Sequence, residues 1–347
     1  MAVGPRTGYR AIVDDLTTSV SPMTDSFGRR ISYVRMSVTD RCDLRCRYCM
    51  AEDMTFLPKR DILSLEELLA LAEIFIARGV TRIRLTGGEP LVRRGIEHLI
   101  EALGGLVGHG LEELTLTTNG TQLRRFAPAL VKAGMRRINV SLDSRDAERL
   151  RYITRRGDLL QVLDGIAAAQ EAGLRIKINM VALKGLNDVE IADMLGWCAD
   201  QGHDLTLIET MPLGEVGEDR TDRYLPLDAV KRELDPRFDL IPSLARTGGP
   251  ARYWDVAGTG TRLGLITPLT NNFCAGCNRI RVAATGTVYG CLGHDQKVEL
   301  RDLLRQGGAA LVDEAIDNLV AGKPQRHAFD IAAHRPAVAR HMSVTGG

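Results

Sequence analysis

A ten-residue stretch with three cysteines constrains this chain more than any other feature. Residues 41–50 read R-C-D-L-R-C-R-Y-C-M, which places Cys42, Cys46 and Cys49 in a C-x3-C-x2-C spacing. Disulfides between residues this close are strained, and three thiols cannot all pair with one another. Thiolates gathered on one short loop are typical of soft metal centres. Three cysteines on a cubane of four irons leave one iron open to a small molecule.

Two alternatives compete with the iron–sulfur interpretation of this loop. The cysteines could be a chance cluster, or part of a zinc site completed from elsewhere in the chain. Asp43 and Tyr48 are poor ligands for iron–sulfur chemistry, so the loop itself supplies no fourth ligand. We favour the cluster because the spacing is unusually specific.

Composition excludes several classes of protein. The chain has 347 residues, enough for one large domain or one domain with a smaller unit. Its net charge of +1 gives no polybasic character, so we expect no nucleic-acid partner. The first residues lack the apolar core of a signal peptide. The apolar stretch 62–80 contains Glu66, Glu67, Glu73 and Arg78, which predicts an amphipathic helix and no membrane span.

Cysteine usage points to metal in a reducing compartment. The chain contains seven cysteines, and six of them fall in two groups of three. Without a secretory signal, such groups indicate metal binding more than a disulfide framework. We therefore expect a cytoplasmic protein.

Strand and helix patterns alternate six times along the first two thirds of the chain. The strands are expected at residues 31–38, 81–85, 113–118, 137–142, 174–181 and 205–210. Ser64 with Glu67 forms a predicted capping box, and Asn187 with Glu190 predicts the start of the last helix. This alternation predicts an α/β fold with a partial (β/α)6 TIM-like barrel. Chemistry in such folds lies at the C-terminal ends of the strands.

Four regions are expected from the change in pattern along the chain. Residues 1–27 read as a mobile N-terminal segment, and residues 28–215 as the barrel. Residues 216–325 form a C-terminal extension with short strands and a second cysteine group. Residues 326–347 are a tail that ends in Gly346 and Gly347. Polar segments at 86–90, 117–120 and 141–143 follow successive strands; each alone reads as a turn, but together they favour a site.

The second cysteine group allows two interpretations. By spacing alone, Cys274, Cys277, Cys291 and His294 resemble a structural zinc site, and that interpretation has the better odds. However, Arg279 and Arg281 lie on one face of the extended segment that follows, because strand side chains alternate. Two cations beside a metal centre suit a polyanionic ligand, although a solvated basic face is equally compatible with charge alone.

The first cysteine loop resembles the radical S-adenosylmethionine (SAM) superfamily, whose members carry C-x3-C-x-aromatic-C, with Tyr48 as the aromatic residue here. Further motifs resemble the GTP 3′,8-cyclase family within it. They include D-S-F-G-R at 25–29, R-L-T-G-G-E-P-L at 84–91, L-T-T-N-G at 116–120, R-I-N-V-S-L-D at 137–143 and G-L-I-T-P-L-T-N-N-F-C-A-G-C-N-R-I-R at 264–281. The order and spacing of these motifs cover nearly the whole chain after residue 24.

The resemblance implies a lyase that performs the first step of molybdenum cofactor biosynthesis. It implies reductive cleavage of SAM, abstraction of hydrogen from C3′ of GTP and attack of that carbon on C8. The product is (8S)-3′,8-cyclo-7,8-dihydroguanosine 5′-triphosphate. The implied cofactors are SAM and two 4Fe–4S clusters, the second carried by the C-terminal extension. The implied partners are GTP, an unidentified electron donor and the next pterin-forming enzyme, for a monomer or homodimer.

The resemblance also assigns residues. Cys42, Cys46 and Cys49 would hold one cluster and Cys274, Cys277 and Cys291 the other, which leaves His294 as a bystander. SAM-contacting positions correspond to Tyr48, Gly88, Ser141 and Met211. GTP-contacting positions correspond to Arg35, Arg84, Thr117, Lys177, Arg279, Ile280 and Arg281. Of these, Arg35, Arg279 and Arg281 are expected to be catalytic.

Some residues depart from the family pattern. Thr206 stands where the family usually has Arg, so a phosphate contact is missing or another residue compensates for it. In the family the tail threads into the active site, whereas a frayed end is the alternative here. The competing functions are another radical SAM enzyme with an auxiliary cluster, for example one that modifies a peptide, and a zinc-binding structural protein.

Overall fold

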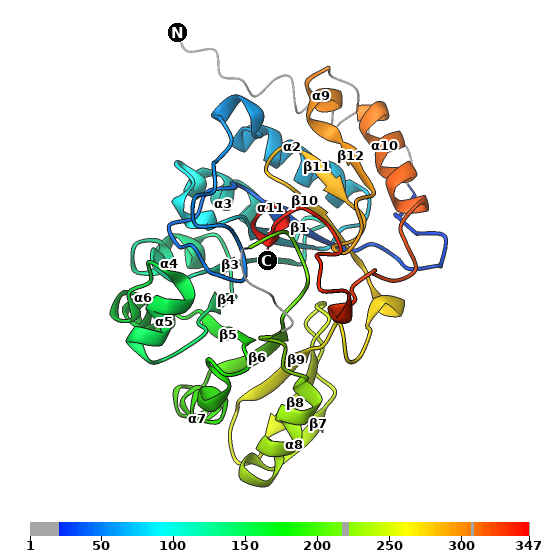
Figure 1. Ribbon diagram of the computed structural model, residues 1–347. Helices are drawn as coiled ribbons and strands as arrows, with labels where there is room; N and C mark the ends of the chain where they lie inside the picture. Colours follow the sequence, from blue (N-terminus) through cyan, green and yellow to red (C-terminus); the bar gives the residue numbers. More distant parts are fainter. Residues whose placement is uncertain (1–20, 217–221, 307–308, 347) are drawn as a thin grey trace.

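Eight parallel strands form the centre of a twelve-stranded sheet that curves into a partial barrel (Figure 1). The computed structural model describes residues 21–216, 222–306 and 309–346. The first six strands lie within two residues of their predicted bounds, which confirms the α/β barrel. They are β1 (Tyr33–Ser37), β2 (Arg82–Thr86), β3 (Glu113–Thr118), β4 (Arg137–Ser141), β5 (Arg175–Ala182) and β6 (Asp204–Glu209).

The C-terminal part of the chain lengthens this sheet at both edges. At one edge β9 (Arg262–Ile266) pairs parallel to β6, followed by antiparallel β8 (Arg252–Val256) and β7 (Leu240–Ser243). At the other edge β10 (Arg279–Val282) pairs parallel to β1, followed by antiparallel β11 (Thr287–Tyr289) and β12 (Lys297–Glu299). The extension therefore continues the barrel wall, a connection that the sequence patterns do not reveal.

Helices cover the outside of the barrel (Figure 1). They are α2 (Leu65–Ala77), α3 (Ile96–Gly104), α4 (Leu123–Lys132), α5 (Ala147–Thr154), α6 (Leu159–Glu171), α7 (Ile191–Gln201), α8 (Leu227–Phe238), α9 (Leu300–Arg305) and α10 (Ala309–Ala321). The short helix α11 (Met342–Thr345) lies instead at the centre of the barrel, against β1. Short 3-10 turns occupy Lys59–Asp61, Pro90–Val92, Asp188–Glu190, Cys274–Gly276 and Ile331–Ala333. The predicted capping box of α2 is confirmed, because Ser64 Oγ accepts from Glu67 N and Glu67 Oε2 accepts from Ser64 N.

The expected cap of the sixth helix is wrong. The Asn187 side chain makes no capping hydrogen bond, and a 3-10 turn precedes α7. Instead, Asn187 Oδ1 accepts from Leu183 N at 2.8 Å, and Nδ2 donates to the carbonyls of Asp143 and Val181 at 2.7 and 2.9 Å. This fully buried amide joins the ends of β4 and β5, which fixes the rim of the barrel above the site.

Each barrel strand has one face toward the helices and one face toward the barrel interior, and the site lies on the interior face. On β1, Val34 and Met36 are fully buried in the hydrophobic core beneath the helices, whereas Arg35 between them points into the barrel. On β2, Ile83 and Leu85 flank Arg84 in the same way. Successive strand side chains point to opposite faces of a sheet. The barrel interior is therefore polar, and the apolar core lies outside it.

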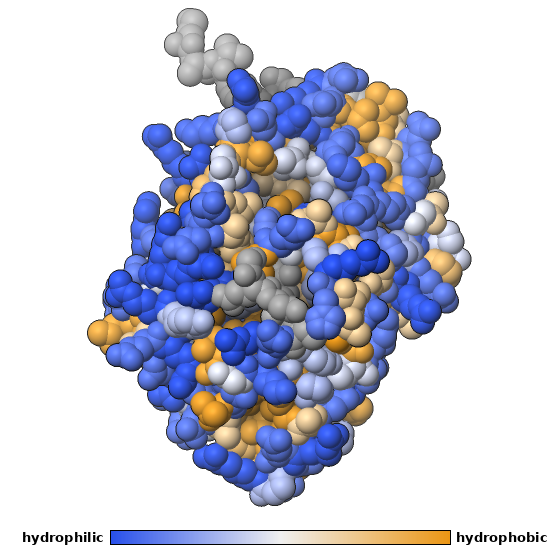
Figure 2. Space-filling model, viewed as in Figure 1, coloured by the Kyte–Doolittle hydropathy of each residue, from blue (hydrophilic) through white to orange (hydrophobic). Residues whose placement is uncertain are grey.

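The N-terminal region is only partly described. Residues 1–20, which belong to the segment expected to be mobile, lie outside the described residues. Met23 and Asp25 in the remainder of that segment are buried. None of the described helices has both the length and the apolar character needed to cross a membrane. The face of the molecule in Figure 2 is predominantly hydrophilic, with apolar side chains in small groups.

Candidate active site

Two cavities lie one above the other inside the barrel. Arg84 and Asn139 line the lower one, and Thr86 and Ser141, two residues further along the same strands, line the upper one. Two residues along a strand span roughly 6.6 Å, so the cavities are stacked along the barrel axis. We call the upper one the cysteine-loop cavity, because Cys42, Cys46 and Cys49 line it. The lower one is the arginine cavity, and each has a volume of about 1090 Å³.

The first cysteine loop is held rigidly at the rim of β1 and β4. The Tyr48 hydroxyl donates to Asp143 Oδ2 at 2.7 Å, and Asp143 Oδ1 accepts from Val181 N at 2.9 Å. The backbone N–H of Arg45 donates to the Thr154 carbonyl at the end of α5 at 3.0 Å. These bonds tie the loop to three other elements, so the three thiols keep a fixed position over the cavity.

The donor set of this loop fits an iron–sulfur cluster. All three thiols are free of disulfides, and burial raises the pKa of the Cys42 and Cys46 thiols. A metal's positive charge is what allows such buried thiols to bind as thiolates. Within the described part of the chain, no three His, Cys, Asp or Glu side chains converge on a single ion. A cubane spaces its thiolates more widely, because each sulfur binds a different iron.

The residues expected to contact SAM all line the cysteine-loop cavity. They are Tyr48, Gly88, Ser141 and Met211. Gly88 packs directly on the cysteine loop, because a Cβ at this position would overlap the Arg41 carbonyl. The buried carboxyl of Glu89 follows it and accepts from Asn119 N at 2.6 Å and Thr118 Oγ1 at 2.8 Å. Glycine is thus required where the β2 loop meets the cysteine loop.

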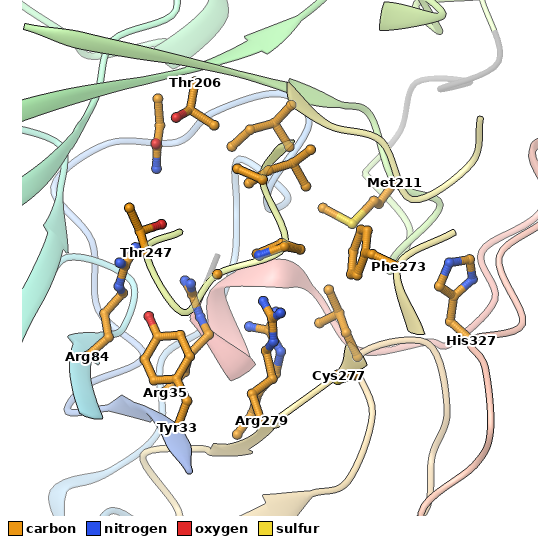
Figure 3. Close-up of a pocket in the computed structure, with 18 of the residues that line it drawn as sticks. Tyr33, Arg35, Arg84, Thr206, Met211, Thr247, Phe273, Cys277, Arg279 and His327 are labelled. Carbon is orange, nitrogen blue, oxygen red and sulfur yellow. The ribbon is translucent and has the colours of Figure 1, made fainter. Parts of the chain in front are cut away.

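The arginine cavity combines a second group of three cysteines with a set of cations. Figure 3 shows Cys277 from this group with Arg35, Arg84 and Arg279. No carboxylate lines the cavity among the described residues. Register places Arg35 on β1 beside Arg84 on β2 and Arg281 on β10. The cysteines that line this cavity are Cys274, Cys277 and Cys291, and the arginines and lysine that line it are Arg35, Arg84, Lys177, Arg279 and Arg281. Five basic groups without a carboxylate favour a polyanionic ligand.

The cations in this cavity repel one another strongly. Burial and the neighbouring Arg281 hold the pKa of Arg35 well below its usual range. Burial and Arg279 lower the pKa of Arg281 to about 10, and burial with Arg137 lowers that of Lys177 to about 7. A bound anion would relieve both the repulsion and the loss of hydration. The free site is therefore electrostatically prepared for phosphate groups.

A buried ion pair anchors the second cysteine loop. Arg29 Nε lies 2.5 Å from Asp25 Oδ2, and Arg29 Nη1 donates to the Cys274 carbonyl at 2.9 Å. Burial raises the thiol pKa of Cys277, but Arg279 and Lys323 outweigh it and hold that pKa below its ordinary value. These three thiols, also free of disulfides, fit a second cluster that faces the arginines.

His294 does not join the second cysteine group. Its Nε2 lies 3.0 Å from the Arg326 carbonyl, and its side chain lines a separate surface hollow with Asn272 and His327. The three cysteines line the arginine cavity instead. The geometry thus argues against the zinc interpretation that spacing alone favours.

Two residues expected to contact GTP lie apart from the arginine cavity. Thr117 lines the cysteine-loop cavity, with its Oγ1 3.4 Å from Arg84 Nη1. The Ile280 side chain is fully buried in the hydrophobic core on the opposite face of β10 from Arg279 and Arg281. Only the backbone of Ile280 can therefore face a ligand.

The two cavities share part of their lining, and the C-terminal tail closes them. Asn179, Ile208, Met211 and Met342 line both. The tail helix α11 packs on β1 at the centre of the barrel (Figure 1). The Gly346 carbonyl accepts from Arg281 Nη1 at 2.7 Å and Arg35 Nη2 at 3.2 Å. Gly347 lies outside the described residues.

Several lining residues were not expected from the sequence. Tyr33, Asn139 and Asn179 share the inward face with Arg35, Ser141 and Lys177, so strand alternation could have found them. Thr247 and Tyr253 come from the C-terminal extension, and no spacing in the sequence links them to the barrel.

Comparison with known proteins agrees with this geometry. Residues 36–198 match the sequence model of the radical SAM superfamily, and residues 203–329 match that of the molybdenum cofactor synthesis C family. The GTP 3′,8-cyclase of Erythrobacter litoralis is 59% identical over 331 residues, which cover 95% of this chain and 100% of that protein. The GTP 3′,8-cyclase of Rhizobium etli is 56% identical over 345 residues, 99% of each chain. The crystal structure of Streptococcus suis SuiB shares the fold, with a TM-score of 0.64 at 14% identity over 90% of this chain and 70% of that one.

Proposed function

This chain belongs to the GTP 3′,8-cyclase family of radical SAM enzymes, and from that premise we propose how its own residues perform the reaction. The enzyme converts GTP into (8S)-3′,8-cyclo-7,8-dihydroguanosine 5′-triphosphate, the first step of molybdenum cofactor biosynthesis. Its cofactors are SAM and two 4Fe–4S clusters. When bound, these cofactors supply the one-electron chemistry that generates the 5′-deoxyadenosyl radical.

The cysteine-loop cavity is the proposed site of the first cluster and SAM. Cys42, Cys46 and Cys49 hold the cluster, and the Tyr48–Asp143 hydrogen bond keeps their loop in place. Gly88, Ser141 and Met211 surround SAM with backbone, hydroxyl and thioether groups. Exclusion of water by the buried walls protects the reactive group made there.

The arginine cavity is the proposed site of GTP and the second cluster. Arg35, Arg279 and Arg281 contact the substrate directly and are the proposed catalytic residues. Arg84 and Lys177 complete the binding of the triphosphate, Thr117 contacts GTP from the upper cavity, and Ile280 contributes its backbone. Cys274, Cys277 and Cys291 would hold the second cluster at the wall of this cavity. The proposal rests above all on five basic side chains beside three cysteines in one cavity, with no carboxylate among the described residues that line it.

Because the two cavities are in contact, the protein can hold SAM and GTP next to each other. In this proposal, C5′ of SAM and C3′ of GTP would meet beside the residues that line both cavities, namely Asn179, Ile208, Met211 and Met342. Holding two reactants in a near-attack geometry removes much of the entropic barrier. The chain's own contribution is thus to bind, align and shield both molecules.

The proposal also covers the enzyme's partner proteins, its oligomeric state and its cellular compartment. A separate electron donor reduces the enzyme, and the next pterin-forming enzyme takes its product, with the chain acting as a monomer or homodimer. A cytoplasmic location fits two sites that each require three free thiols, because thiols stay reduced there.

Iron and sulfide analysis of anaerobically purified protein tests the two-cluster assignment. About eight irons per chain are expected, whereas four irons with one zinc would overturn it. Incubation with GTP, SAM and a reductant tests the substrate. Formation of 5′-deoxyadenosine should depend on GTP and be lost in Arg281→Ala, and GTP-independent formation would contradict the proposed substrate site.

A further inference from the structure

A chain of hydrogen bonds lies at the edge of the arginine cavity, and only one of its members was expected there. Lys177 Nζ donates to the Tyr253 hydroxyl, which lies 2.9 Å from Thr247 Oγ1. All three residues line the cavity, and Tyr253 is only 4% exposed. They come from β5, β8 and the segment between β7 and β8, so the C-terminal extension reaches a cation of the barrel through this contact.

Two small residues let Tyr253 reach across the sheet. Register aligns Asn179, Thr206, Gly264 and Tyr253 in one row over β5, β6, β9 and β8. A Cβ at Gly264 would lie 2.8 Å from Tyr253 Cε1 and 2.9 Å from Thr206 Oγ1. The phenol ring therefore passes close over Gly264, in space that a larger residue would fill, and its hydroxyl reaches Lys177 on β5.

The charges around Lys177 explain why its position needs support. Burial, together with the nearby charges of Arg137, Arg84 and Arg262, lowers its pKa to about 7, while Asp204 opposes this shift. Two of these arginines are neutralised, since Arg137 Nε lies 2.5 Å from Glu113 Oε1 and Arg262 Nη2 lies 3.0 Å from Asp204 Oδ2. Tyr253 supplies a neutral acceptor that adds no charge of its own.

We propose that Tyr253, assisted by Thr247, is a positioning residue that holds the Lys177 amine toward the substrate phosphates, and that Thr206 and Gly264 provide the space for its ring. The inference rests on the proposed function in one respect, namely that Lys177 contacts GTP. Because the Tyr253 hydroxyl accepts from Lys177, its own proton is free to be donated to Thr247 Oγ1, and this donation would orient the hydroxyl's lone pairs toward the amine.

GTP binding is expected to change the protonation state of Lys177. Free Lys177 is largely neutral above pH 7, whereas a bound phosphate stabilises the ammonium form. GTP binding is therefore expected to take up protons, and the uptake should grow toward one proton per site as the pH rises above 7. Loss of the Tyr253 hydroxyl removes an acceptor of the charged form, which moves this uptake to lower pH.

Calorimetric titration of anaerobically purified holoenzyme with GTP, in two buffers of different ionisation enthalpy, tests the proposal. Tyr253→Phe should bind GTP about 10-fold more weakly, since it loses a hydrogen bond to a charged group. Its proton uptake should begin at lower pH, and kcat at saturating GTP should stay close to that of the wild type. Tyr152→Phe, which removes an exposed hydroxyl, is the matched control and should change neither quantity.

A double-mutant cycle tests the role of the glycine. Gly264→Ala should weaken GTP binding more in the wild type than in Tyr253→Ala, where no ring remains to be displaced and only the Thr206 hydroxyl must give way. Equal effects in both backgrounds would overturn the proposed fit of ring and glycine.

The variants also separate this inference from the function on which it rests. Lys177→Met should weaken GTP binding and abolish proton uptake. If Lys177→Met binds GTP normally, the proposed phosphate contact fails. If Lys177→Met binds weakly while Tyr253→Phe binds normally and only unfolds at a lower temperature, the contact stands and the positioning role of Tyr253 is overturned.

Discussion

The backbone carbonyl of Gly346 accepts a hydrogen bond of 2.7 Å from Arg281 Nη1, so the end of the chain lies on a proposed catalytic arginine. Gly346 has a φ of +71°, and a Cβ at this position would overlap Thr86 Oγ1. Both the backbone conformation and the space therefore require glycine. The tail therefore packs closely against Thr86 and Arg281 at Gly346.

Gly346→Ala is expected to release the tail from Arg281 and lower the rate of GTP cyclisation at least about 10-fold, a loss of roughly 1.4 kcal/mol. Measured product formation checks this. Gly258→Ala is the matched control, because Gly258 has a φ of +72° with open space around it and so carries only the backbone cost. Full activity of Gly346→Ala would show that the tail contact is dispensable.

Asp25→Asn is expected to loosen the second cysteine loop. It leaves the buried Arg29 guanidinium without its counter-charge, which costs about 3 kcal/mol in the free energy of unfolding. Because Arg29 also holds the Cys274 carbonyl, iron content should fall by about half while the first cluster is retained. Chemical denaturation and iron analysis check both effects.

Asp61→Asn is the control for this change, since the Arg60–Asp61 pair is exposed and lies at 3.8 Å. It should alter stability by less than about 1 kcal/mol and leave iron unchanged. Equal effects of the two substitutions would argue against any special role for the buried pair.

The barrel strands and the site cysteines could be predicted because their signals are local. Strand β3 is an alternating segment between clear turn residues, and its predicted bounds match the structure. The three-cysteine loop requires only spacing within ten residues. Arg35 and Arg281 followed from motif resemblance, and their adjacency follows from the pairing of β1 with β10.

What could not be predicted depends on strand pairing between distant parts of the chain. Tyr253 reaches Lys177 only because β8, β9 and β6 align in one register, which no local pattern encodes. Spacing alone also favoured zinc at the second group, because it cannot reveal that His294 turns away toward Arg326. Contacts that depend on the pairing of strands far apart in the sequence can be identified only from the structure.

His294→Ala is expected to keep the full iron content and activity. Its ring contacts a backbone carbonyl on the surface and lines no part of the arginine cavity. Cys291→Ala should lose about half of the iron, since one cubane loses a ligand. Iron and zinc analysis of both variants checks this, and loss of bound metal in His294→Ala would restore the zinc interpretation.

Acid is expected to destabilise the protein partly through His203. Burial lowers the pKa of this side chain, which packs edge-on against Trp197 at 5.4 Å. The unfolded chain binds a proton near pH 6.5 while the native chain does not, so stability rises with pH through that window and falls below it. His203→Phe keeps the ring contact without the titration. Its melting temperature should therefore depend less on pH than that of the wild type between about pH 5.5 and pH 7.5, whereas the exposed control His109→Phe should not differ from wild type.

Thr206→Arg is expected to impair GTP binding even though it adds a cation to a cation-rich site. Thr206 is 2% exposed and stands against the place where Tyr253 crosses Gly264, so a guanidinium there must displace the phenol ring. Overpacking of this kind typically costs 1–3 kcal/mol. In Tyr253→Ala the vacated volume can accept the new side chain, so Thr206→Arg should strengthen GTP binding in that background while weakening it in the wild type. Calorimetry on the four proteins of this cycle measures the sign in each background. The same sign in both would mean that the tyrosine and the residue at 206 do not compete for one space.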